Sequence, residues 1–148
     1  MKNTTKRRRN RKGAATVEFA FVAPLLFALI FGMVECSRGM MVWHATTGAA
    51  RAGARLGIIP TSSNADVEEA ARAFLTASGI DAQNARVAVL LDGAVGDPST
   101  ATRGQMVQVD VAIDYADVSF VGNANFFADD AVIAGSCIMR TESAEEAP

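Results

Sequence analysis

Residues 14–34 read AATVEFAFVAPLLFALIFGMV, and Glu18 is the only charged residue among them. As an α-helix, these 21 residues would span about 31 Å, close to the ~30 Å thickness of a bilayer's hydrocarbon core. Pro24 and Gly32 interrupt the apolar run, but membrane helices tolerate both residue types. The stretch therefore predicts a single membrane-spanning helix.

Charge is distributed unevenly along the 148 residues. Residues 1–12 hold seven of the fourteen Lys and Arg residues, whereas all sixteen Asp and Glu residues come after Gly13. The positive-inside rule predicts a cytoplasmic N-terminus and an exported C-terminal part, and this asymmetry argues against a buried core helix. The basic end has no aromatic residues for base stacking and the acidic remainder would repel phosphate, so no nucleic-acid partner is expected.

Glu18 lies inside the apolar stretch, where an ionised carboxylate costs roughly 2.5–3.5 kcal/mol at the bilayer centre and less near the interface. It is therefore a candidate functional residue, although it could instead snorkel to the cytoplasmic surface. A cut between Gly13 and Ala14 would create an α-amino group four residues before Glu18. An amine and a carboxylate one helical turn apart, on one helix or on neighbouring subunits, neutralise each other in apolar surroundings. Such a pair would set the register of stacked subunits.

Several segments together resemble a known family. Residues 12–20 read KGAATVEFA, which resembles the class III prepilin cleavage and assembly motif, with Gly at the cut and Glu as the fifth mature residue. Residues 24–26 (PLL), Gly32, Glu35, Arg38 and residues 49–55 (AARAGAR) resemble TadE-like pseudopilins of the tight-adherence (Tad/Flp) pilus system. The resemblance is specific over residues 11–55 and weaker beyond, where residues 139–142 (MRTE) look familial.

The resemblance implies that a prepilin peptidase cuts between Gly13 and Ala14 on the cytoplasmic face, and that Glu18 is the assembly residue. It implies a bacterial inner-membrane protein with a cytoplasmic N-terminus and a periplasmic or extracellular domain. Its partners would be the membrane, the peptidase, other pilins and Tad assembly proteins, in a system linked to adhesion, biofilm and secretion. The chain is longer than major Flp-type pilins, which favours a minor subunit.

Two alternatives remain open. The chain could be an unprocessed, single-pass periplasmic binding or scaffold protein that keeps residues 1–13. It could also be a secreted domain released by signal peptidase, with a mature chain starting after about Ala45, although the apolar run is long for a secretory signal.

The helical pattern continues past Val34 and ends near Gly57, ahead of Pro60. The part of this helix from Gly39 to Gly57 is rich in Gly and Ala, which predicts close packing against another element or a partner helix. Trp43 fits either the headgroup belt or the domain core, and the core is favoured. The predicted organisation is a basic leader over residues 1–13, a helix over 14–57 that crosses the membrane over 14–34, and an exported domain over 58–148.

The exported part predicts a pilin-like α+β fold. Residues 64–78 have helical spacing, with Ser63 or Asn64 as a cap and Gly79 as a stop. Alternating residues predict strands at 87–91, 107–115 and 131–141, so about three antiparallel strands are expected. The intervening loop reaches Arg103, and residues 143–148 are expected to form a frayed tail.

No catalytic residue, metal site or cofactor is predicted. His44 has no nucleophile beside it in a known motif, and the chain lacks the common catalytic and nucleotide-binding motifs. Calcium could bind to the carboxylates of Asp110, Asp114 and Asp117, but carboxylates on the solvent-exposed face of a strand are common. Cys36 and Cys137 are far apart in the sequence, so two unpaired, packed thiols are the favoured interpretation.

Overall fold

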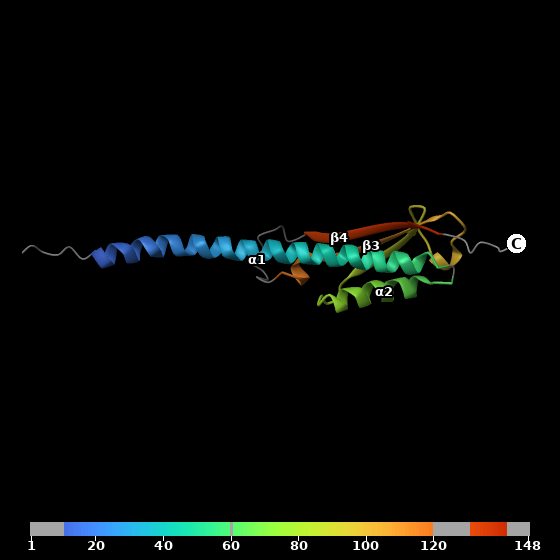
Figure 1. The fold of residues 1–148 in the computed structure, drawn as a ribbon, viewed down its shortest axis with the longest axis horizontal. Coiled ribbons are helices and arrows are strands. Elements are labelled where there is room, and N and C mark those ends of the chain that lie inside the picture. The colour runs from blue at the N-terminus through green and yellow to red at the C-terminus, as the bar shows by residue number, and fades with distance from the viewer. Residues whose placement is uncertain (1–10, 60, 120–130, 142–148) are drawn as a thin grey trace, which may run out of the picture. The chain divides into compact units, whose positions relative to one another are not determined.

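The computed structural model describes residues 11–59, 61–119 and 131–141 (Figure 1). The predicted α+β class is confirmed. The predictions for the leader before residue 11 and for the tail after residue 142 lie outside the described residues. The elements, in chain order, are α1 (Arg11–Gly57), α2 (Asn64–Ala77), β1 (Arg86–Leu91), β2 (Ala94–Val95), the 3₁₀ turn η1 (Pro98–Thr100), β3 (Met106–Asp114), the 3₁₀ turn η2 (Tyr115–Asp117) and β4 (Val132–Arg140).

The chain divides into two compact units, Met1–Val34 and Glu35–Pro148. In the first unit, α1 exposes nearly all of its large apolar side chains, and Phe21 is 80% exposed. Among the described residues, α1 is the one helix long and apolar enough to cross a membrane. Exposing this much apolar surface to water is unfavourable, so this segment fits the predicted membrane anchor.

The second unit contains the rest of α1, α2 and the sheet. Ser63 and Asp66 cap α2 reciprocally: the Ser63 side chain accepts from the Asp66 amide, and the Asp66 carboxylate accepts from the Ser63 amide at 2.8 Å. This capping box satisfies amides that the first helical turn leaves without a partner. Gly79 follows the helix with a φ of +76°, a conformation that glycine adopts without strain. The predicted second helix is therefore confirmed, with its end at Ala77.

The sheet has four antiparallel strands in the order β2-β1-β3-β4, not the three expected. The extra strand, β2, is two residues long and lies in what sequence alone indicated was a loop. Strand β3 ends at Asp114, one residue earlier than predicted, because Tyr115 begins η2. The alternating residues of β3 are all buried, as their period of two predicted: Val107, Val109, Val111 and Ile113.

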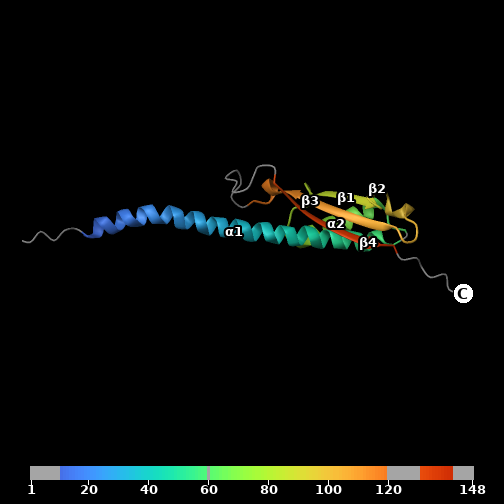
Figure 2. The same ribbon diagram turned by 90° about the horizontal axis from the view of Figure 1, so that it is seen from above.

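Two helical segments pack on the sheet, as both ribbon views show (Figures 1 and 2): residues 35–57 of α1, and α2. A Cβ added to Gly53 would lie 3.2 Å from atoms of both Val67 on α2 and Val109 on β3. A Cβ at Gly48 would lie 2.4 Å from the ring of Phe74. The small residues of α1 therefore serve packing within this chain, and the prediction of close packing against another element is confirmed.

Trp43 is 48% exposed, so the favoured prediction that it lies in the domain core is wrong. The core positions nearby on α1 belong to smaller residues instead, Val42, Ala45, Ala49 and Ala50.

Candidate functional site

The predicted processing bond and assembly residue lie on the first turns of α1. Gly13, Ala14 and Glu18 are all exposed, and nothing lies within 4 Å of a Cβ built on Gly13. The Gly13–Ala14 bond is close to the start of α1 at Arg11, and helix ends fray. Glycine also has a low helix propensity. Opening the backbone here for a protease therefore costs little folding energy.

Ala14 and Glu18 are four residues apart on one continuous helix, so they lie on the same face about one turn apart. This spacing matches the predicted pairing of a new α-amino group with a carboxylate. Within the first compact unit, Glu18 is therefore available for contacts with a neighbouring helix.

A second polar site, whose role sequence analysis missed, joins α1 to the segment after β3. Glu35 is 1% exposed, and the Tyr115 hydroxyl donates a hydrogen bond to its Oε1 at 2.5 Å. The Ser119 hydroxyl donates to the same oxygen, and the Arg38 Nε donates to the carbonyl of Val118. Glu35 and Arg38 are three residues apart on one helical face, so together they fasten this segment to α1.

This environment changes the acidity of Tyr115. Burial, followed by the hydrogen bond and negative charge of Glu35, raises the pKa of Tyr115 to about 12 from 10.0. Tyr115 therefore stays protonated and remains a hydrogen-bond donor at any physiological pH. Glu35 and Arg38 entered the sequence analysis only through the family resemblance. The signal for a docking role was a charged pair at i and i+3 directly after an uncharged run.

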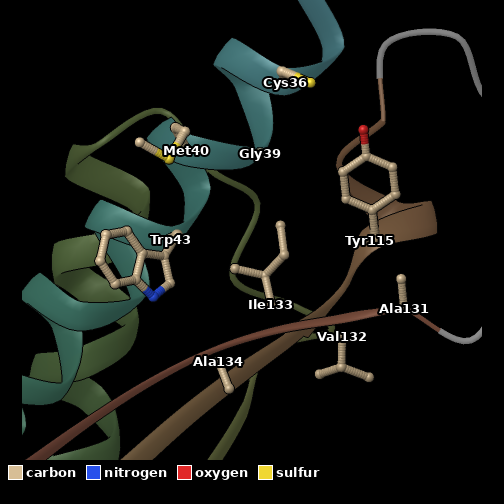
Figure 3. A pocket seen from close by; sticks show the side chains of 9 residues that line it. All are labelled: Cys36, Gly39, Met40, Trp43, Tyr115, Ala131, Val132, Ile133 and Ala134. Carbon is tan, nitrogen blue, oxygen red and sulfur yellow. The ribbon is translucent and has the colours of Figure 1, made fainter. Parts of the chain in front are cut away.

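An apolar pocket of about 730 Å³ lies beside this polar site (Figure 3). Cys36, Gly39, Met40 and Trp43 form its α1 wall, spaced three or four residues apart along one face. Tyr115 and residues 131–134 form the other side, and Ile133 points from β4 toward α1. No side chain in this lining carries a formal charge at neutral pH.

The remaining candidates make ordinary structural contacts. The Arg86 and Asp114 side chains form a salt bridge at 2.7 Å, and Gln108 donates to both carboxylate oxygens of Asp110. The ring of His44 lies 5.0 Å from that of Trp43. Within residues 11–59, 61–119 and 131–141, no group of three or more His, Cys, Asp or Glu side chains is placed to hold a metal ion.

The two cysteines differ in environment. Both thiols are free, and Cys137 is half-buried against the core. Cys36 is exposed at the pocket, so the prediction of a packed thiol is wrong for that residue.

Comparison with known proteins finds a similarity over the N-terminal part of the chain. The model of the family described as "TadE-like protein" matches residues 13–55, which confirms the resemblance drawn from the sequence. No curated protein and no solved structure matches the chain. The matched residues include the predicted processing bond, Glu18, the predicted membrane-spanning stretch, and Glu35 and Arg38.

Proposed function

We propose that this chain, which is TadE-like over residues 13–55, is a minor pilin-like subunit (a pseudopilin) that a prepilin peptidase processes between Gly13 and Ala14. The family match carries the coarser statement, that the chain is a pilin-like protein associated with a Tad pilus. The match covers the processing motif and the anchor together, and this continuity supports the finer proposal.

The physical basis is the charge that processing would create. A free α-amino group has an unperturbed pKa of about 7.7–8.0, so the new Ala14 amine would be largely protonated at neutral pH. Glu18 lies one turn further along the helix, within reach of that amine or of the amine on an adjacent subunit. In apolar surroundings, an uncompensated charge is strongly unfavourable, so adding a subunit is favoured only where amine and carboxylate meet.

The exported position of the domain follows from the basic leader. The positive charges of residues 1–12 would hold the N-terminus in the cytoplasm of a bacterium, with residues 14–34 in the inner membrane. The α+β domain would then contact other pilins and Tad inner-membrane assembly proteins. In adhesion and biofilm formation it would also contact the surface to which the cell attaches. The proposal gives the chain no catalytic role.

The decisive test is N-terminal sequencing of membrane-extracted protein expressed with and without a prepilin peptidase. With the peptidase, we expect a mature chain beginning at Ala14. A Gly13→Leu variant should stay full length because the bulky side chain obstructs the cut, whereas Gly32→Leu, also a glycine of α1 with open space around it, should be processed normally.

Other N-termini would contradict the proposal. A chain that keeps residues 1–13 in the presence of the peptidase would instead be an unprocessed anchored binding or scaffold protein. A chain starting after about Ala45 would be a secreted domain released by signal peptidase.

A further inference from the structure

The apolar pocket beside α1 has no role in the proposed function. We propose that it binds one acyl chain of a membrane phospholipid. This inference needs only the membrane anchor and is independent of processing at Gly13.

The pocket wall exposes apolar side chains, and exposing them to water is energetically unfavourable. Met40 is 58% exposed and Trp43 is 48% exposed, and both line the pocket. The uncharged lining offers no counter-charge for an anionic headgroup or a charged peptide. A hydrocarbon chain satisfies this lining because it needs no hydrogen-bond partner.

The position of the pocket along α1 favours a lipid as the source of that chain. The wall begins at Cys36, two residues after the membrane-spanning stretch ends at Val34, and it ends at Trp43, about two and a half helical turns past Val34. Large apolar residues thus continue along the sequence from residues 14–34 to Met40 and Trp43 of the pocket wall. Tryptophan is also enriched where hydrocarbon meets the headgroup layer. Because two residues of chain reach at most about 7 Å, Cys36 stays close to the lipid around Val34, and that lipid is the nearest source of an acyl chain.

Trp43 reports directly on the occupant because it is the only tryptophan. The full-length chain is reconstituted into phosphatidylethanolamine–phosphatidylglycerol vesicles whose acyl chains carry bromine near their middle. Bromine quenches tryptophan fluorescence on close contact. We expect Trp43 to be quenched in these vesicles relative to vesicles of unbrominated lipid.

Two neighbouring methionines supply a matched pair of variants. Met40→Glu places a charge in the pocket wall and should lose most of the quenching. Met41 is 45% exposed and does not line the pocket, so Met41→Glu should keep the quenching of the wild type. Both variants add the same charge at almost the same position along α1, so they control for any change in membrane depth.

A third variant fills the pocket without adding charge. Gly39 lines the pocket, and a Cβ there would lie 3.8 Å from the Tyr115 ring, an ordinary contact, so the leucine side chain of Gly39→Leu should extend into the pocket and remove most of the quenching. Native mass spectrometry of the wild-type chain released from detergent should show a retained phospholipid.

Each contrary result overturns the proposal. Equal quenching in the wild type and all three variants would mean that Trp43 senses bulk lipid and that the pocket takes no chain. An unquenched wild type, or a lipid-free chain in the mass spectrum, would mean the same. A Cys36–Cys36 crosslink between copies without quenching would assign the pocket to a second copy of this chain.

Discussion

Glu35 and Tyr115 bring a carboxylate and a phenol into contact inside the domain although they are 80 residues apart in the sequence. The Tyr115 and Ser119 hydroxyls both donate to Oε1 of Glu35. Hydrogen bonds to an ionised acceptor are stronger than those between neutral groups, and a buried hydroxyl left without an acceptor costs about 1–3 kcal/mol. Glu35 is thus a structural carboxylate where the domain begins, whereas Glu18 remains exposed.

This contact predicts an unusual titration. Tyr115 is the only tyrosine, so the ultraviolet absorbance of phenolate follows it alone. We expect ionisation near pH 12 in the native chain and near pH 10.0 in denaturant, in line with the raised pKa of Tyr115. Because the pKa is higher in the folded state, the stability that Tyr115 contributes is present below about pH 10 and is lost as the pH rises from about 10 to 12.

Variants at Glu35 and Glu18 test whether Glu35 helps to raise the pKa of Tyr115. Glu35→Ala removes the hydrogen bond and the nearby charge, so it should move the native titration toward lower pH. Glu18→Ala should leave it unchanged because Glu18 belongs to the other compact unit. Native titration of the wild type near pH 10 would contradict this account.

At the scale of elements, β4 and α1 approach so closely at Gly135 that a larger residue there would collide with the backbone of α1. A Cβ on Gly135 would lie 2.4 Å from the Thr47 amide nitrogen and 2.6 Å from the Thr46 carbonyl carbon. Both obstacles are backbone atoms of a helix, so neither moves without disturbing α1. At Gly48, by contrast, the obstacle is the ring of the Phe74 side chain, which can rotate.

Gly135→Ala should therefore destabilise the domain by about 1–3 kcal/mol, the range for overpacking a tight core. The measurement is denaturant unfolding of the full chain in detergent, followed by Trp43 fluorescence. Ser136→Ala is the control: this exposed neighbour on β4 should change stability by no more than about 0.5 kcal/mol. Equal unfolding midpoints for the two variants would show that β4 and α1 are not in this close contact.

At the scale of the whole molecule, the two compact units divide the proposed work. The unit up to Val34 carries the exposed apolar surface, the predicted processing bond and Glu18. The unit from Glu35 carries the core, the docking contacts of Glu35 and Arg38, and the pocket. A change at Glu18 is therefore expected to affect the proposed assembly and to leave the fold of the second unit intact.

Glu18→Gln tests that division because it keeps the size of the side chain and removes its charge. We expect normal cleavage after Gly13 and unchanged unfolding of the domain, with loss of pilus formation, because the new Ala14 amine then has no carboxylate partner. Electron microscopy of surface pili and an immunoblot for processing measure the two effects. Normal piliation by Glu18→Gln would remove Glu18 from assembly.

Sequence alone determined the features that depend on local pattern. Length and hydropathy predicted the membrane anchor. The cap at Ser63 and the stop at Gly79 predicted α2, and the alternation of residues from Val107 to Ile113 predicted β3. It also carried the family resemblance, because the relevant residues lie within one continuous stretch.

Only the tertiary structure decided the contacts between distant segments. The short strand β2 exists because β1 provides its hydrogen-bond partners, and two residues are too few to give a periodic signal. Tyr115 leaves the alternation of β3 and contacts Glu35, which no local pattern encodes. Trp43 is exposed because smaller neighbours on α1 fill the core, and the pocket forms only where α1 meets β4. Local periodicity specifies elements, whereas burial and hydrogen-bond partners depend on which elements meet in space.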